Sequence, residues 1–191
     1  MTRIKILEYI KKLKEEDIAR RYFVMNSFDG ALTILGIIIS MYLGGISDPR
    51  VVVIAGIGAA TALGVSGFWG AYASERAERM HSLRELEQHM LSDLRGTDIE
   101  KEMKTIVLLV ALVDGLSPFL VSLILVVPFI VLSAPASFYA SMLMVVLILF
   151  VLGVLLAKIS MESALRSGLK MVSAGVVIGI LLLAIDNLKV I

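Results

Sequence analysis

The sequence predicts an all-α membrane protein with five transmembrane helices, and three observations lead to this prediction. First, 58% of the 191 residues are hydrophobic and the mean hydropathy is +0.91, which is far too apolar for a water-soluble domain. Second, five apolar stretches reach the length of about 20 residues that a helix needs to cross a bilayer. Third, the basic residues are confined to the segments between particular stretches.

The distribution of Lys and Arg predicts the topology. All of them except Arg50 and Lys189 fall in the N-terminal segment, in the loop 75–104 or in the region around 158–170. Basic loops stay in the cytoplasm, so the N-terminus is expected inside and the C-terminus outside. The spans are expected at about 22–45, 51–74, 105–132, 138–158 and 168–187. The chain then divides into a cytoplasmic amphipathic helix (1–21), spans 1 and 2 (22–74), a cytoplasmic helical loop (75–104) and spans 3 to 5 (105–191).

The segments outside the spans also carry helix signals. In residues 3–21 an apolar stripe predicts a helix resting on the inner membrane surface, formed by Ile4, Leu7, Ile10 and Leu13. Asp48 and Pro49 predict an N-cap and a first helical residue for the second span.

The loop between spans 2 and 3 is expected to be helical and to project into the cytoplasm. No stop signal follows the second span, and the helical pattern continues to Gly96, a natural C-terminal cap. Thr97 or Asp98 then offers an N-cap for the helix that enters the third span.

Two carboxylates, Asp29 and Asp114, open long apolar runs with the same Asp-Gly step. A carboxylate within a lipid-spanning helix costs a few kcal/mol, so by default it indicates a functional site. The shared step predicts a parallel internal repeat of spans 1–2 and 3–4, with both carboxylates at similar depth. The expected role of this site is to move a cation or a proton across the membrane.

Polar residues accompany Asp29 on one face of the first span, at steps of three and four. They are Asn26, Asp29, Thr33, Gly36, Ser40 and Gly44. A seam of small residues for helix packing is the alternative interpretation, and it suits Gly36, Ser40 and Gly44. It does not explain an amide and a carboxylate.

On the third span, Asp114 is followed by Ser117 and Pro118. Proline lacks an N–H, which frees the backbone carbonyl of Asp114 four residues earlier. Asp114 then offers a carboxylate and a carbonyl at one point, and hard divalent cations take such oxygen ligands. The alternative is a kinked helix in which Asp114 is protonated or hydrogen-bonded. The candidate ion path therefore comprises Asp29, Asp114, Asn26, Thr33 and Ser117.

The projecting helix carries residues at metal-ligand spacing. His81, Glu85 and His89 recur every four residues, Glu78 lies one turn before, and Glu162 on the other inner loop is expected to reach the same region. Imidazole with carboxylate suits first-row divalent metals. The alternative is a solvated charged helix, in which pairs such as Glu75–Arg79 give ordinary support.

Several classes of protein are excluded or disfavoured. The chain has no cysteine, so disulfides and thiolate metal sites are ruled out. It has no nucleotide-binding loop, and its histidines lie on one helix, so an enzyme is not expected. We expect no cofactor and no nucleic-acid partner; the partners expected are membrane lipid and divalent metal ions.

Four motifs resemble those of the vacuolar iron transporter family. They are Asp29-Gly30; Ser66, Gly70, Tyr72 and Glu78 at the end of the second span; Gly115 with Pro118; and Gly168–Met171. The resemblance implies a homodimer that exports Fe2+ or Mn2+ from the cytosol in exchange for protons, with Asp29 near the dimer interface. It implies a prokaryotic cell membrane, or a vacuolar-type membrane in a eukaryote.

The chain also departs from this family. The family's second span carries a Glu and a Met on the ion path, and the aligned positions here are Ala59 and Gly67. The cytoplasmic loop is shortened, so the family's glutamate-rich metal site is incomplete. Asp114 is a candidate replacement for the missing carboxylate. A non-transporting scaffold or regulatory protein, or a transporter of another cation, stays open as the alternative function.

Overall fold

The computed structural model describes residues 3–188, with side chains from Ile18 onward except at residue 159. All regular structure within this range is helical, and each of the five helices contains a stretch long and apolar enough to cross a membrane. The helices are α1 (Arg3–Leu43), α2 (Pro49–Met90), α3 (Asp98–Val131), α4 (Ala136–Ser160) and α5 (Ala164–Asn187). The all-α fold with five candidate spans is confirmed, whereas the sidedness of the termini and the internal repeat stay predictions.

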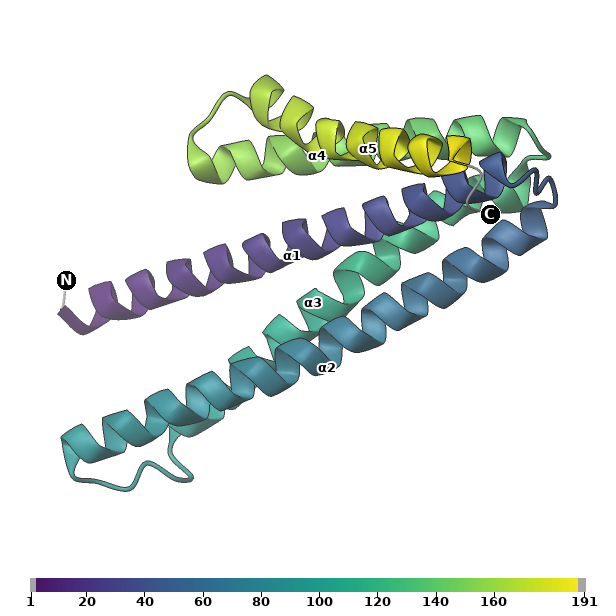
Figure 1. The fold of residues 1–191 in the computed structure, drawn as a ribbon. Coiled ribbons are helices and arrows are strands. Elements are labelled where there is room, and N and C mark those ends of the chain that lie inside the picture. Colours follow the sequence, from purple (N-terminus) through teal and green to yellow (C-terminus); the bar gives the residue numbers. More distant parts are fainter. Residues whose placement is uncertain (1–2, 189–191) are drawn as a thin grey trace.

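Successive helices run in opposite directions (Figure 1). The α2–α3 and α4–α5 turns lie at one end of the molecule, and the α1–α2 and α3–α4 turns lie at the other. Helix α1 lies between the α2–α3 and α4–α5 hairpins and contacts all four other helices. α1 is therefore the element through which the two hairpins are joined.

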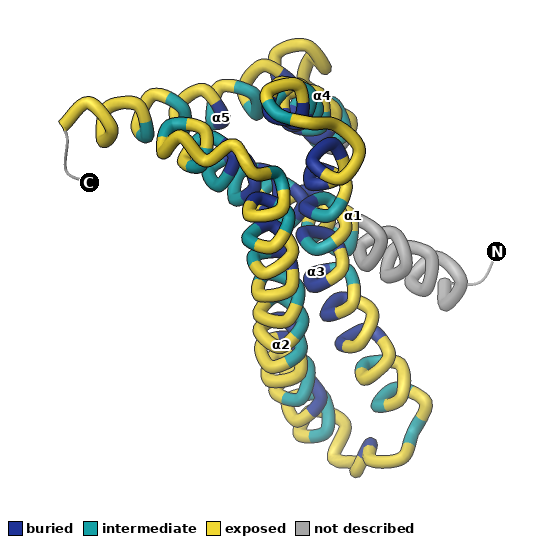
Figure 2. The backbone as a smooth tube through the Cα atoms, turned by 90° about the vertical axis from the view of Figure 1, so that its right-hand side faces the viewer, coloured by how far each residue is buried: buried dark blue, intermediate teal, exposed yellow. Residues whose placement is uncertain are grey.

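The apolar core lies where α1, α3 and α4 meet, and Figure 2 shows their buried faces turned toward one another. Ile34 and Ile38 from α1 are at most 1% exposed, and Leu125 from α3 is fully buried. The rings of Phe129 and Phe138 pack edge to face at 4.9 Å, joining the end of α3 to the start of α4. Toward the opposite end the α2–α3 hairpin leans away from α4 and α5 (Figure 1).

Helix α1 runs without a break from Arg3 to Leu43. The segment expected as a separate cytoplasmic helix (1–21) is thus continuous with the first span over its described part. The expected apolar stripe of Ile4, Leu7, Ile10 and Leu13 lies outside the residues whose side chains are described.

Two predicted helix starts are confirmed. Asp48 caps α2 by accepting a hydrogen bond from the N–H of Arg50 at 2.9 Å, and Pro49 is the first helical residue. α3 begins at Asp98 after Thr97. In both cases the cap residue has extended backbone dihedrals, as a helix N-cap requires.

The predicted end of α2 at Gly96 is wrong, because the helix ends at Met90. Leu91 adopts the left-handed conformation (φ 49°), and the turn that follows is held by side chains. Glu87 Oε1 accepts from the N–H of Leu94 at 3.0 Å, and Glu100 Oε2 accepts from that of Gly96 at 2.6 Å. Gly96 (φ 75°) instead belongs to the turn before α3. The projecting part of the hairpin is therefore shorter on the α2 side than predicted.

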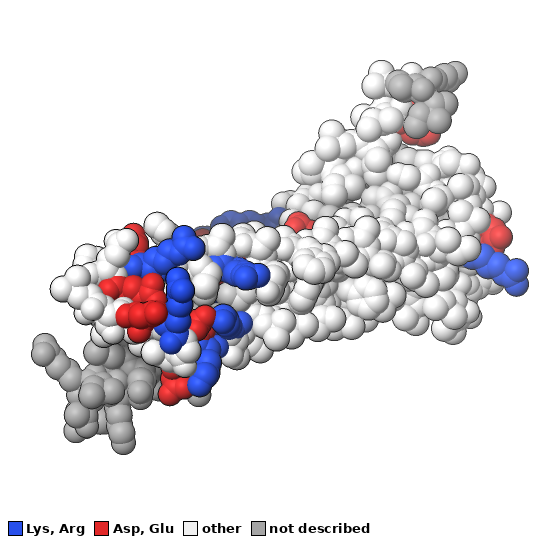
Figure 3. Space-filling view, turned by 90° about the horizontal axis from the view of Figure 1, so that it is seen from below, with Lys and Arg blue, Asp and Glu red and all other residues white. Residues whose placement is uncertain are grey.

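Charged side chains gather at the end of the molecule that carries the α2–α3 turn, and the middle of the visible face is almost free of them (Figure 3). This separation suits a protein whose middle lies in hydrocarbon, where a charge is costly. The structure thus describes an integral membrane protein with one strongly charged end.

Candidate functional site: a polar seam between α1, α2 and α3

Asp114 lies on α3 within the apolar part of the helix and is only 8% exposed. Its carboxylate is not isolated, because Asn26 on α1 donates a hydrogen bond from Nδ2 to Asp114 Oδ1. The same Nδ2 also donates to the backbone carbonyl of Tyr22 at 2.9 Å. Asn26 therefore links the buried carboxylate of Asp114 on α3 to the backbone of α1.

Asp29 lies one turn beyond Asn26 on α1, so the two residues share one face of the helix. Asn26 bonds to Asp114, so Asp29 lies one helical turn from the residue that holds the other carboxylate. That both carboxylates belong to one site stays a prediction. Unlike Asp114, Asp29 is exposed on the surface of the single chain. Within a membrane span, an exposed carboxylate faces lipid, water or a second subunit, and lipid is the costliest of these.

Glu75 is a site residue that the sequence analysis missed. It lies on α2, is 8% exposed, and accepts a hydrogen bond from the Tyr22 hydroxyl at 3.3 Å. Arg79 Nε pairs with its other oxygen at 3.2 Å. The sequence analysis placed Glu75 and Arg79 on a solvated helix. The signal that could have found Glu75 is its helical spacing from Ala60 and Ala71, because all three lie on the buried face of α2.

These residues form a continuous set of polar contacts that we call the polar seam. It runs from Glu75 to the Tyr22 hydroxyl, along α1 from the Tyr22 carbonyl to Asn26, and on to Asp114. Its bonded members are Tyr22, Asn26, Glu75 and Asp114. We include Asp29 in the seam because it lies one turn beyond Asn26 on the same face of α1. The seam connects the charged part of the α2–α3 hairpin with the apolar middle of the bundle.

Helices α2 and α3 approach each other closely beside Asp114, at Gly67. A Cβ at Gly67 would lie 2.9 Å from the Asp114 carbonyl oxygen and 3.2 Å from Oδ2, so both oxygen groups of Asp114 face Gly67. Pro118 has no N–H with which to bond that carbonyl. The sequence-based expectation of a carboxylate and a carbonyl at one point therefore agrees with this geometry.

The remaining candidates for the ion path stand apart from these contacts. Ser117 is 3% exposed, and its hydroxyl donates to the carbonyl of Val113 in its own helix. Thr33 lies half-buried on α1, one turn beyond Asp29. On the next turn of α3, the hydroxyl of Ser122 donates to the carbonyl of Gly30 at 3.4 Å, which joins α1 and α3 beyond the carboxylates.

The candidate metal ligands of the projecting helix do not come together in one chain. His81 Nε2 and Glu85 Oε1 are 3.4 Å apart, but Glu162 instead pairs with Lys170 at 2.9 Å. His81 and His89 are about 12 Å apart along the helix axis, which is too far to share one ion. Among the described residues no three His, Asp or Glu side chains are grouped as a metal site. Glu78, His81, Glu85 and His89 thus form an open charged face.

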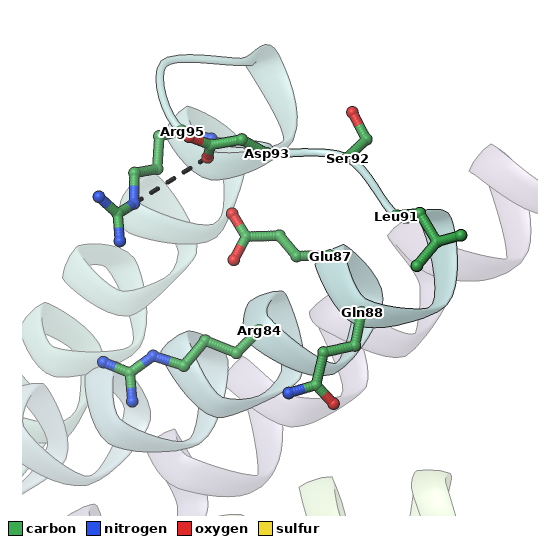
Figure 4. A pocket seen from close by; sticks show the side chains of 7 residues that line it. All are labelled: Arg84, Glu87, Gln88, Leu91, Ser92, Asp93 and Arg95. Atoms are coloured by element: carbon green, nitrogen blue, oxygen red, sulfur yellow. Dashed lines mark hydrogen bonds and ion pairs between the residues drawn. The ribbon is translucent and has the colours of Figure 1, made fainter.

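A hollow at the tip of the α2–α3 hairpin is separate from the seam (Figure 4). Its lining carries both signs of charge, with Glu87 between Arg84 and Arg95, and Arg95 reaches Asp93 at 4.0 Å. Because Glu87 also caps the turn through Leu94, this hollow is explained as part of the structure of the turn.

Five spans around a polar seam are the features of a membrane transport protein. The sequence profile of the VIT family matches residues 20–107, which carry the span of α1, all of α2 and the start of α3. An uncharacterized protein of Methanocaldococcus jannaschii is 32% identical over 170 residues, covering 87% of this chain and 88% of that protein. The chain belongs to the vacuolar iron transporter (VIT) family, whose members are membrane metal-ion transporters and not enzymes.

We predict that the Asn26–Asp114 contact stabilises the bundle. Asn26→Leu leaves a largely buried carboxylate without its donor, which should lower the free energy of unfolding by about 1–3 kcal/mol. The double variant Asn26→Leu/Asp114→Leu should recover most of this loss, because both polar groups are then gone. Reversible unfolding in mixed micelles measures both. The single variant Asp114→Leu completes the cycle, and simple additivity of the effects of the two single variants would show that the contact contributes nothing.

Proposed function

We propose that this protein is a secondary transporter that exports Fe2+ or Mn2+ from the cytosol in exchange for protons. The observation that supports this best is the polar seam, in which Asn26 binds the carboxylate of Asp114 within apolar spans. Asp29 lies one turn beyond Asn26, and a third carboxylate, Glu75, lies toward the charged end. Borderline divalent ions accept carboxylate, carbonyl and amide oxygens as ligands. Asp114 offers its carboxylate and its carbonyl at one point, and Asn26 adds an amide oxygen.

The contacts of the seam suggest an order of events. The carboxylate of Glu75 pairs with Arg79 and accepts a hydrogen bond from Tyr22, and the carboxylate of Asp114 accepts one from Asn26. A metal ion arriving from the charged end would displace these donors one after the other and replace them as the positive partner of each carboxylate. Protonation of the same carboxylates from the opposite side would release the ion, and this couples the two fluxes.

The open face of Glu78, His81, Glu85 and His89 fits a supporting role. Its side chains are exposed at the charged end, and His81 and Glu85 already lie within 3.4 Å of each other. Weak binding there would raise the local concentration of metal beside the seam without holding the ion tightly. Glu162 is held by Lys170 and stands outside this proposal.

The second candidate is a scaffold or regulatory protein on the same fold, or a transporter of another cation. The observation that favours a scaffold is that Asp114 and Glu75 are each bonded within the chain, as structural polar groups are. Ala59 and Gly67, at the positions aligned with the family's Glu and Met, also favour it. Flux measurements separate these candidates from metal export.

We predict that Asp29→Asn, Asp114→Asn and Glu75→Gln each reduce metal flux at least tenfold while the protein stays folded. Each change keeps the volume of the side chain but removes the negative charge that must balance the ion. The readout is Mn2+ flux into proteoliposomes with and without a pH gradient, repeated with Fe2+, Co2+ and Zn2+.

Asp186→Asn, at the exposed end of α5, is the matched control and should leave flux unchanged. His81→Ala with His89→Ala should raise the metal concentration needed for half-maximal flux without abolishing it. Wild-type flux in all three seam variants would remove these residues from the ion path. Absence of metal flux in the wild type would favour the scaffold.

The functional unit is proposed to be a homodimer that covers the exposed face of α1. Asp29 and Ser40 are exposed on this face, and a Cβ at Gly36 would meet nothing within 4 Å. Small residues at such a face allow a second helix to approach closely, and a partner would spare Asp29 from lipid.

The absence of native cysteines makes this interface directly testable. Ser40→Cys should give cross-linked dimers in membranes, whereas Leu181→Cys, on the exposed face of α5, should not. Equal and low yields from both positions, together with a monodisperse monomer in lipid nanodiscs, would contradict the dimer.

A further inference from the structure

An apolar groove of about 270 Å³ lies on the outer face of the α2–α3 hairpin. Its lining includes Gly64 and Gly115, where the two helices touch, since a Cβ at Gly115 would lie only 2.6 Å from the Gly64 carbonyl oxygen. Large apolar side chains complete the lining, among them Val65 and Trp69 from α2 and Leu116 from α3. Trp69 is 62% exposed and Leu116 is 50% exposed, so the groove opens outward.

Aromatic side chains lead from this groove toward the charged end of the molecule. The rings of Phe68 and Tyr72 are stacked at 6.3 Å with an angle of 8° between their planes, and Trp69 packs edge-on against both. Trp and Tyr favour the level of the lipid headgroups. The groove therefore begins in the apolar part of the hairpin and ends at the membrane interface.

Arg76 lies one helical turn beyond Tyr72, where the apolar run of α2 has ended. Its Nη1 is 3.5 Å from the Tyr72 hydroxyl, and its guanidinium carbon lies 5.9 Å from the centre of the ring. Among the described residues no carboxylate pairs with Arg76, whereas the nearby Arg79 is paired with Glu75. Tyr72 thus holds, beside the end of the groove, a cation that no carboxylate of the described residues neutralises.

We propose that the groove and Arg76 together bind one anionic phospholipid of the inner leaflet. An acyl chain fills the groove between Gly64 and Leu116, and the phosphate is bound by the Arg76 guanidinium. Arginine presents several N–H donors in a plane, which suits phosphate oxygens. One lipid would bind at both places, because the groove for its acyl chain leads toward Arg76, and Tyr72 holds Arg76 near the level expected for the phosphate.

The test is lipid retention by the purified full-length protein, measured by native mass spectrometry after exchange into phosphatidylglycerol or phosphatidylcholine. The wild type should retain phosphatidylglycerol in preference, by about fivefold for one basic residue near the surface. Arg76→Gln should abolish the preference. Arg84→Gln is the matched control, because Arg84 is an exposed arginine about two turns further along α2, and it should keep the preference.

A second variant tests the groove itself. Leu116→Trp enlarges an exposed wall residue without entering the core, and should reduce the retention of both lipids. Circular dichroism and melting in detergent verify that each variant is folded. An unchanged lipid preference in Arg76→Gln would overturn the proposal. A change of oligomeric state in Leu116→Trp without lipid loss would instead assign the groove to a second copy of the chain.

Discussion

The hydrogen bond from Asn26 to Asp114 is the interaction on which the rest of the site depends. A carboxylate within an apolar span requires a polar partner, and α1, which contacts all four other helices, supplies that partner. The bond sets the rotation of α1 relative to α3. Once that rotation is set, Tyr22 reaches Glu75 from one turn before Asn26, and Asp29 lies one turn after Asn26 on the same face.

The glycines of the three helices make this arrangement possible. Gly67 leaves room for the carboxylate and the carbonyl of Asp114, and a Cβ at Gly30 would lie 2.7 Å from the Pro118 carbonyl oxygen. Larger side chains at either position would push the helices apart and separate the polar groups that now touch. Gly64 and Gly115 also pack closely together and leave a groove on the outer face of the hairpin. The close approach of α2 to α3 at glycine residues therefore shapes both the polar seam and the groove.

Much of the fold could be predicted from the sequence, because long apolar runs and the Asp48 cap are local signals. Helical periodicity also predicts that Asn26 and Asp29 share one face of α1. The spacing of Glu75 from Ala60 and Ala71 could have indicated its burial, but its hydrogen bond from Tyr22 could not be predicted, because Tyr22 is distant in the sequence. Helix α2 ends before the predicted Gly96, and the side chain of Glu87 caps the turn that follows it. The metal ligands expected on the projecting helix do not come together within one chain. Residues spaced every four positions share a face of the helix, but they lie at different heights along its axis.

The central claim is that the polar seam binds the transported ion, and the most direct test is to locate the ion. Crystals of the full-length protein soaked with Mn2+ and measured at the manganese absorption edge would give its position by anomalous scattering. The account predicts a peak within coordination distance of the Asp114 carboxylate, and its loss in Asp114→Asn. Peaks confined to the exposed face of His81 and Glu85, with none in the seam at saturating Mn2+, would contradict it.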